Sequence, residues 1–392
     1  MSVFHQSALW SLAFRPFFLL ASLASVVGLL IWIAFINFGV LLTYQQVLPP
    51  LLWHIHEMIF AFTLTIAIGF LLTAVQTWTG LKSLHGYSLI FLSSIWLVIR
   101  FLLLLNPMEY SGLVMAIMTL QATWWLIALF TLSRLIIKVR SHRNYIFIPF
   151  MITLMIFNLS FIYWGSEGEI SLVLHLARST LLVFSIVVGI IAGRVIPLFT
   201  RNAINEPKRI KPTLMLDRWI LILSIIGSVN FFLSYFVLWP LNPAWILLMV
   251  GLLHLYRLSR WGSFYTFKVP LLWSLHVAYF ALGIGLVFVS ASFFYEKIRM
   301  SDAFHLITVG VFGGMILTMI SRVSLGHTGR PLQVKKAMIF AFVLIFIASI
   351  LRVAVALMGQ PIFAWNSSAV FWIIAFSIFL WIYFPILMTT RK

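Results

Sequence analysis

Apolar runs of membrane-spanning length recur along the whole of this sequence and constrain its fold more than any other feature. About twenty consecutive apolar residues form a helix that crosses the hydrocarbon core of a bilayer. Twelve such runs, bounded by Pro, Gly, Asn or charged residues, lie near residues 17–38, 50–76, 86–105, 111–134, 146–164, 171–197, 213–236, 243–260, 269–291, 303–321, 335–357 and 365–386. We therefore predict an all-α, polytopic membrane protein with twelve transmembrane helices.

Composition agrees with that fold class and excludes others. The 392 residues are 63% hydrophobic and 9% charged, which leaves too little polar surface for a soluble core of this size. No connection between spans is long enough for a soluble domain, so we expect one integral membrane domain over residues 1–392. The absence of cysteine excludes disulfides, cysteine-ligated iron–sulfur clusters and covalently attached c-type haem. The first run, from about Phe17 to Phe38, lacks a small-residue cleavage site and is expected to be a transmembrane helix.

Basic residues indicate which ends of the spans face the cytoplasm. An even number of spans puts both termini on one side, and a cytoplasmic N-terminus collects 21 of the 26 Lys and Arg residues at inner loops and helix ends. The net charge of +18 then reflects the positive-inside rule and not a nucleic-acid surface. Arg100, Arg178 and Arg352 fall within or at the ends of spans, and Lys297 and Arg299 fall outside. The inner set comprises Arg15, Lys82, Arg134, Lys138, Arg140, Arg143, Arg194, Arg201, Lys208, Arg209, Lys211, Arg218, Arg257, Arg260, Lys268, Arg322, Arg330, Lys335, Lys336, Arg391 and Lys392.

Glu57, one of eight acidic residues, lies inside the second apolar run beside two histidines, in Trp53-His54-Ile55-His56-Glu57-Met58. Ionisable groups within membrane segments are costly and are usually kept for a function. We therefore expect a functional site here; the alternative is a polar helix end at the membrane surface.

Four histidines are predicted to lie near the outer leaflet. His54 and His56 open the second span, His175 the sixth and His305 the tenth, and all three spans run from outside to inside. The 19 residues from His175 to Arg194 correspond to about 28 Å of helix, close to the hydrocarbon thickness. The sixth and tenth spans also resemble each other, which suggests three units of four helices or a chance likeness of apolar helices.

Imidazole is the usual protein ligand for haem iron and copper, and a ligand set within a helix bundle comes from facing helices. His54 and Glu57 share a helix face, whereas His56 points away from it. The two histidines are therefore not expected to chelate one ion together unless the turn after Pro49-Pro50 is irregular.

Two further features of the later spans leave alternatives open. Gly310, Gly313 and Gly314 form a strip without side chains beside the tenth-span histidine, which a flat macrocycle or a second helix can approach. His276 and Tyr279 share a face of the ninth span. They are either part of a redox or proton route or a satisfied polar contact. Ordinary surroundings are expected for the remaining histidines, His5, His85, His142 and His254.

The predicted inner ends carry arginines set among Gly, Pro and Thr. Positive-inside loops explain basic residues in general, but planar bidentate donors also suit haem propionates, a quinone carbonyl or another oxyanion. The candidate cofactor-binding residues are Arg15, Arg194, Arg201, Arg322, His327 and Arg330.

Four ordered motifs carry a resemblance to a known family. They are Phe14-Arg15-Pro16-Phe17-Phe18, His54-Ile55-His56-Glu57-Met58, Gly193-Arg194-Val195-Ile196-Pro197 through Arg201-Asn202, and Arg322-Val323-Ser324-Leu325-Gly326-His327-Thr328-Gly329-Arg330. Together they resemble the NnrS family of bacterial membrane proteins. The resemblance implies haem and copper, a role in nitric oxide metabolism or nitrosative stress resistance in denitrifying and related bacteria, and a place in the bacterial inner membrane.

The predicted architecture is also similar to that of haem–copper oxidases and their nitric oxide reductase relatives, which carry metal-binding histidines on the second, sixth and tenth of twelve core helices. Here the seventh span has no histidine. We expect a b-type haem between the second and tenth helices, ligated by His305 and either His54 or His56, with copper or a second haem near His175. His276 is a further candidate metal ligand.

The expected function is reduction or detoxification of nitric oxide at a buried His-ligated metal centre, with membrane quinol as the electron donor. Glu57 and Tyr279 are the catalytic candidates, Glu57 as a proton relay. Two alternatives remain: a non-catalytic factor that binds nitric oxide or metal, and a secondary transporter, which would have helices broken at mid-depth.

Overall fold

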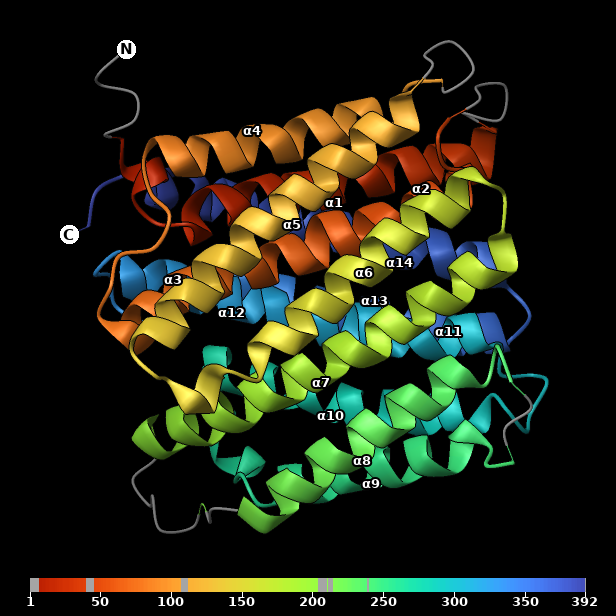
Figure 1. Ribbon diagram of the computed structural model, residues 1–392. Helices are drawn as coiled ribbons and strands as arrows, with labels where there is room; N and C mark the ends of the chain where they lie inside the picture. The colour runs from red at the N-terminus through yellow and green to blue at the C-terminus, as the bar shows by residue number, and fades with distance from the viewer. Residues whose placement is uncertain are drawn as a thin grey trace. The chain divides into compact units, whose positions relative to one another are not determined.

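The fold is seen in a computed structural model, which describes residues 7–39, 46–106, 112–203, 210, 214–237 and 240–391 (Figure 1). All regular structure in these ranges is helical. The predicted inner residues Lys208, Arg209, Lys211 and Lys392, and also His5, lie outside the described residues.

Twelve long helical segments run through the described residues, one for each predicted span. They are α1 (Phe14–Phe38), α2 (Pro50–His56) continued by η2 (Glu57–Leu64) and α3 (Thr65–Thr79), α4 (Tyr87–Leu102), α5 (Leu113–Lys138), α6 (Phe147–Ser166), α7 (Ile170–Ala203), α8 (Leu214–Leu233), α9 (Pro243–Ser259), α10 (Pro270–Ala291), α11 (Met300–His305) continued by η6 (Leu306–Gly313) and α12 (Gly314–His327), α13 (Lys336–Leu357) and α14 (Pro361–Met388). Ten segments are long and apolar enough to cross a membrane, and α4 and α9 are shorter, at 16 and 17 residues. The chain is a multi-pass, all-α membrane protein.

Proline and glycine set several helix boundaries. Proline occupies the first position of α2, α9 and α10, where its missing N–H is not needed. The side chain of Asn242 also accepts a hydrogen bond from the Ala244 N–H at the start of α9. At the C-terminal ends of α1 and α3, Gly39 and Gly80 adopt left-handed conformations with φ of 65° and 68°.

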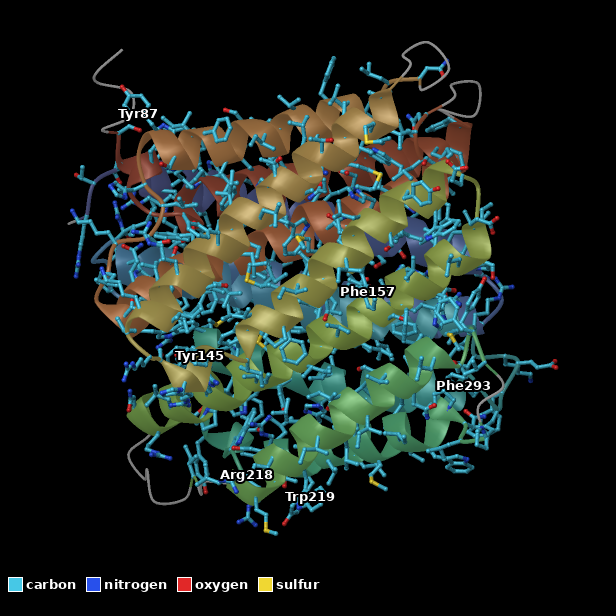
Figure 2. The ribbon with its side chains drawn as sticks, in the orientation of Figure 1. Tyr87, Tyr145, Phe157, Arg218, Trp219 and Phe293 are labelled. Atoms are coloured by element: carbon cyan, nitrogen blue, oxygen red, sulfur yellow. The ribbon has the colours of Figure 1, made fainter. Side chains whose placement is uncertain are left out.

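Exposed aromatic residues mark the ends of some helices. Tyr87 lies at the start of α4 and is 62% exposed, and Trp219 near the start of α8 is 51% exposed beside the exposed Arg218 (Figure 2). Tyr and Trp are enriched at membrane–water interfaces, where a ring meets both apolar and polar surroundings. These positions agree with the predicted span ends.

The chain divides into two compact units. Unit 1 comprises the described parts of residues 1–177, 323–331 and 379–392, and unit 2 those of 178–322 and 332–378. This division does not follow the boundaries of three groups of four consecutive helices.

Unit 1 is built around α1, which packs against η2 and α3. The Phe14 N–H donates to Thr73 Oγ1 at 3.0 Å, so the start of α1 is fixed to α3. Helices α4, α5 and α6 form successive contacts in the same unit (Figure 1). Arg15 Nη1 donates to the carbonyl oxygens of Leu387 and Thr389, each at 2.7 Å. The beginning of α1 and the end of α14 therefore lie at the same end of unit 1, as an even number of spans requires.

Unit 2 contains a close helix pair, α9 and α10, which meet at Gly251 and Gly283. A Cβ atom added at Gly251 would lie 2.8 Å from the Gly283 carbonyl oxygen, and one added at Gly283 would lie 3.0 Å from the Gly251 oxygen. Small residues let membrane helices approach until their backbones touch, which strengthens van der Waals packing where lipid provides no hydrophobic driving force.

The second and tenth spans each contain eight residues of π-helix, η2 and η6, and each π segment begins immediately after a histidine. Helix α2 is a regular α-helix through His56, so the turn that carries both histidines is not irregular. Single π turns inside α-helices are frequent at functional sites because they rotate the following side chains. Both π segments therefore indicate that the histidines before them, His56 and His305, are candidate functional residues.

We predict that Gly251→Ala destabilises the protein by about 1–3 kcal/mol, because the new methyl group overpacks the contact between α9 and α10. Gly28→Ala is the matched control: Gly28 is also buried within a helix, but its nearest neighbour, Glu57 Cβ, would lie 4.0 Å from the added Cβ. Thermal unfolding of the purified variants in detergent measures the difference. Equal unfolding temperatures for the two variants would contradict the close contact.

Candidate functional site

Glu57 lies buried in unit 1 between an imidazole and a guanidinium. Its Oε1 is 3.1 Å from His56 Nδ1 and 3.4 Å from Arg100 Nε. His56 is fully buried, and Glu57 is 7% exposed. The carboxylate is thus removed from lipid and held beside a positive charge, which offsets the cost of burying it.

The partners of His56 determine which of its nitrogens carries a proton. Trp125 Nε1 donates to Asn158 Oδ1 at 2.9 Å, so the amide nitrogen of Asn158 faces His56. That nitrogen lies 3.1 Å from His56 Nε2, which must be the acceptor. Nδ1 therefore carries the proton and donates it to Glu57. Both ring nitrogens are engaged, so His56 in this arrangement suits proton exchange with Glu57 better than metal binding.

Sequence reasoning did not identify Asn158 or Trp125 as site residues. The available signal was a lone amide within the apolar run 146–164. Such a group needs a hydrogen-bonding partner in the bilayer, but sequence spacing cannot show that the partner is on another helix.

The other predicted outer histidines of unit 1 have different surroundings. His54 stacks on Trp32 of α1, with ring centroids 4.3 Å apart and an interplanar angle of 10°. His54 and His56 thus point to different neighbours, as expected from a regular α-helical turn. His175 is buried in the second turn of α7, with 7% of its surface exposed.

In unit 2, His305 belongs to a cluster with a buried ion pair. Arg352 Nη1 of α13 lies 2.5 Å from Asp302 Oδ1, and both side chains are buried. His305 Nδ1 lies 2.6 Å from the Ser301 carbonyl oxygen and 3.4 Å from Arg352 Nη2. The carbonyl oxygen can only accept and is much the closer partner, so it favours the proton on Nδ1 and the lone pair on Nε2 over a hydrogen bond from Arg352 to Nδ1. This tautomer is the one in which metal-ligating histidines are commonly held.

The glycine strip that follows His305 is filled by neighbouring side chains. Added Cβ atoms would meet Ser349 at Gly310, Trp372 at Gly313 and Phe346 at Gly314, within 2.5 to 2.7 Å. Of the two alternatives for this strip, helix packing is confirmed. A macrocycle does not fit against these glycines.

His276 and Tyr279 have separate partners although they share a helix face. His276 Nε2 lies 2.9 Å from Thr200 Oγ1, and its Nδ1 lies 2.9 Å from Ser263 Oγ. Both ring nitrogens are thus engaged by hydroxyl groups. The satisfied polar contact is the alternative that this geometry favours for His276.

Tyr279, which is fully buried, joins a network that connects α8, α9 and α10. Arg257 Nη1 donates to the Tyr279 hydroxyl at 3.0 Å, and Arg257 Nη2 lies 2.8 Å from Asp217 Oδ1. The same hydroxyl lies 2.6 Å from His254 Nδ1. Because the hydroxyl oxygen accepts from arginine, its own proton is available to His254. His254, expected to have ordinary surroundings, is instead the end of this network.

Two glycines of α7 make room for the network. An added Cβ at Gly193 would lie 1.9 Å from Arg257 Nη2, and one at Gly189 would lie 3.2 Å from His254 Cε1. The Gly189 carbonyl oxygen also accepts a hydrogen bond from Arg257 Nη1 at 3.1 Å. These positions therefore accommodate a buried guanidinium and an imidazole.

The predicted cofactor-binding arginines are distributed over the two units. In unit 1, Arg15 contacts the C-terminal carbonyls of α14, Arg330 Nη2 donates to Thr389 Oγ1 at 2.9 Å, and the His327 ring lies 5.6 Å from the Phe14 ring. A guanidinium at a helix C-terminus satisfies free carbonyls and complements the helix dipole. Binding to these carbonyl oxygens accounts for Nη1 of Arg15.

In unit 2, the guanidinium of Arg322 lies 3.8 Å from the centroid of the Phe199 ring. Arg201 is exposed, and Arg194 is half-buried on α7. The structure thus groups Arg15, His327 and Arg330 within one unit and Arg194, Arg201 and Arg322 within the other.

Haem and copper make different demands on the side chains of the protein. In the part of the chain that the structure describes, no group of three or more His, Asp or Glu side chains is arranged to hold a metal. Copper needs such a group, whereas a porphyrin supplies four nitrogens and asks the protein only for axial imidazoles. His305 presents the required tautomer.

We predict that Arg352→Met destabilises the protein by about 3–5 kcal/mol, because it leaves the Asp302 carboxylate buried without its partner. The double variant Asp302→Asn/Arg352→Met removes both charges and should recover most of that loss. Thermal unfolding followed by circular dichroism in detergent compares the two. If the single variant is as stable as the unmodified protein, the ion pair is not buried as described.

Comparison with known proteins assigns the chain to a family. A family profile described as NnrS protein matches residues 8–391, nearly the whole sequence. No curated protein matches the chain. Because the matched region includes all four motifs and every candidate site residue, the chain belongs to the NnrS family.

Proposed function

We propose that this protein is a membrane haem protein that takes up nitric oxide from the bilayer and reduces it with electrons from membrane quinol. The observation that carries the proposal is the His305 tautomer, with Nδ1–H held by the Ser301 carbonyl and the lone pair on Nε2. Such an imidazole is prepared to act as an axial ligand. The resemblance to NnrS proteins supplies the link to nitric oxide.

When bound, haem would supply the site at which a small neutral gas binds and accepts electrons. Reduction of two NO molecules to nitrous oxide and water consumes two electrons and two protons, and oxidation of one quinol releases the same numbers. The protein must therefore deliver protons into an apolar interior. His305 is the candidate haem ligand in unit 2, and His54 and His175 are the candidates in unit 1. We assign no complete ligand set to copper, which the family resemblance implies.

The pair formed by His56 and Glu57 suits proton delivery in unit 1. Nδ1 and Oε1 are 3.1 Å apart, so a proton can move between them without rearrangement of either side chain. Asn158 holds Nε2, and Arg100 stabilises the ionised form of Glu57. Glu57 is the member that we propose exchanges protons with the reaction.

The Tyr279 network supports a second proton-holding site in unit 2. A proton given by the Tyr279 hydroxyl to His254 Nδ1 would leave a phenolate 3.0 Å from Arg257 Nη1. The arginine donates a hydrogen bond to that negative charge and so stabilises it. Tyr279 and His254 thus form a local donor and acceptor pair.

A non-catalytic role is the alternative of a different class. A factor that only binds nitric oxide would use the same imidazoles and would need no electron donor or proton relay. Purified protein supplied with quinol and nitric oxide distinguishes the two, because only the reductase forms nitrous oxide.

A transporter is a third possibility, and it predicts helices unwound at mid-depth. The second and tenth spans are interrupted by η2 and η6, but these π segments keep the backbone helical. The described geometry of these two spans therefore does not favour transport.

We predict that Glu57→Gln leaves the haem content unchanged and slows quinol-dependent consumption of nitric oxide by about tenfold or more, because the amide cannot carry the proton. The matched control is Glu167→Gln, which changes an exposed residue in the same way. A nitric oxide electrode measures the rates. Undiminished turnover in the Glu57 variant would remove the relay role.

We predict that His305→Ala loses most of the bound haem. The matched control is His85→Ala, since His85 also has Nδ1 close to a carbonyl oxygen, that of Ser83 at 2.8 Å, but lies in a loop. The haem-to-protein ratio and the reduced-minus-oxidised visible spectrum report the outcome. Full haem content in the His305 variant would exclude this residue as the essential ligand.

A further inference from the structure

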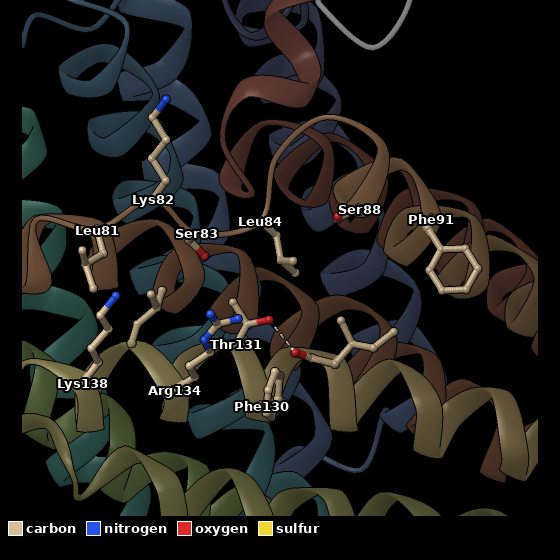
Figure 3. Close-up of a pocket in the computed structure, with 12 residues that line it drawn as sticks. Leu81, Lys82, Ser83, Leu84, Ser88, Phe91, Phe130, Thr131, Arg134 and Lys138 are labelled. Atoms are coloured by element: carbon tan, nitrogen blue, oxygen red, sulfur yellow. Dashed lines mark hydrogen bonds between the residues drawn. The ribbon is translucent and has the colours of Figure 1, made fainter.

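A cavity of about 580 Å³ opens in unit 1 where the chain leaves α3 and enters α4. Its lining comes from the loop after α3, the first turns of α4 and the last turns of α5 (Figure 3). The volume lies within the range of small-molecule sites. None of the residues proposed above to act on nitric oxide contributes to it.

Three cations line this cavity: Lys82 from the loop, and Arg134 and Lys138 from α5. The lining includes no acidic residue, and none of the three cations forms an ion pair with any residue that the structure describes. An unopposed positive cluster of this kind favours an anion.

The lining changes from charged to apolar along α5. Lys138, Arg134, Thr131 and Ile127 follow one another at helical spacing on one face, over about 16 Å of helix. Figure 3 shows the Lys138 and Arg134 side chains, and the hydrogen bond of 2.7 Å from Thr131 Oγ1 to the Ile127 carbonyl. The cavity thus has a cationic end at the helix terminus and an apolar end deeper in the membrane segment.

Two aromatic rings extend the apolar end. Phe91 of α4 is 57% exposed and Phe130 of α5 is 66% exposed, and both line the cavity. On helices that cross a bilayer, exposed rings of this kind contact lipid. A molecule that fills both ends of this cavity would be an amphiphile with an anionic head and a hydrocarbon portion.

Ser83 provides an independent indication of a polar ligand. The residue is 5% exposed, lines the cavity between Lys82 and Leu84, and its Oγ is buried without a hydrogen-bonding partner among the described residues (Figure 3). The contact of 2.8 Å between His85 Nδ1 and the Ser83 carbonyl oxygen fixes the loop that presents it. Buried hydroxyl groups in native proteins nearly always have a partner, so the Ser83 hydroxyl needs one from the ligand.

We propose that this cavity binds the headgroup of an anionic phospholipid. The phosphate would accept hydrogen bonds from Lys82, Arg134 and the Ser83 hydroxyl, and the first acyl carbons would lie against Phe91 and Phe130. The predicted topology puts these cations at the cytoplasmic surface, where anionic headgroups attract basic residues near membrane helices.

Native mass spectrometry of the full-length protein, released from micelles containing phosphatidylglycerol, tests this directly. We expect the unmodified protein to retain the lipid and the variant Lys82→Gln/Arg134→Gln/Lys138→Gln to bind it at least about tenfold more weakly, from the loss of three cations. The matched control is Lys268→Gln/Lys335→Gln/Lys336→Gln, which removes three exposed cations outside the cavity. If the triple variant does not fold, the single variants Arg134→Gln and Ser83→Ala replace it. Each should weaken retention of the lipid, by less than the triple variant would.

Each outcome supports or overturns the site. Equal retention by the unmodified protein and the cavity variants overturns it, as does equal loss in the control triple variant, which would indicate general surface charge. Retention of phosphatidylcholine as strong as that of phosphatidylglycerol would overturn the selectivity for a net negative headgroup. Displacement of the lipid by an equal concentration of inorganic phosphate would show a free-anion site instead.

Discussion

The pairing of a carboxylate with an arginine from another helix is the interaction on which the described structure depends. A bilayer core offers no water to a charged or polar group, so any such group must be satisfied within the protein. Glu57 pairs with Arg100 of α4, Asp217 with Arg257 of α9, and Asp302 with Arg352 of α13. Each pair connects two consecutive spans, and each lies beside a histidine or tyrosine. The same charges thus stabilise helix packing and orient the groups that we propose carry protons and bind haem.

The hydrogen-bonding neighbours of each imidazole determine how the histidines differ in what they can do. An imidazole binds metal only through a nitrogen with a lone pair, and the neighbour of the other nitrogen decides which one that is. Asn158 and Glu57 contact Nε2 and Nδ1 of His56, whereas the Ser301 carbonyl places the proton of His305 on Nδ1. Histidines that look alike in the sequence therefore have different surroundings, and we propose different roles for them, His56 in proton exchange and His305 as a haem ligand.

The helices could be predicted from the sequence because apolar run length and the Pro and Gly boundaries are local properties. The side-chain contacts between helices could not be predicted, because helical periodicity shows which residues share a face but not which helix that face meets. His276 and Tyr279 share a face, yet one contacts Thr200 and Ser263 while the other contacts His254 and Arg257. A usable signal was nevertheless present in Arg100 and Arg352, two of the three arginines that fall within or at the ends of spans. Each of these two has a buried carboxylate beside it, Glu57 and Asp302 respectively.

The π segments connect these local choices to the architecture of the spans. A π turn adds a residue and rotates everything after it by about 100° relative to a continuous α-helix. In the tenth span this rotation occurs between His305 and the glycines that pack against Trp372 and Phe346. On both sides of the π segment the span faces α13, through Arg352 beside His305 and through Ser349 and Phe346 beside the glycines. In the second span the π segment begins at Glu57, so the turn with both histidines is set independently of α3 and its contacts with α1. In both spans a π segment thus separates the turn that carries the histidine from the packed α-helix that follows it.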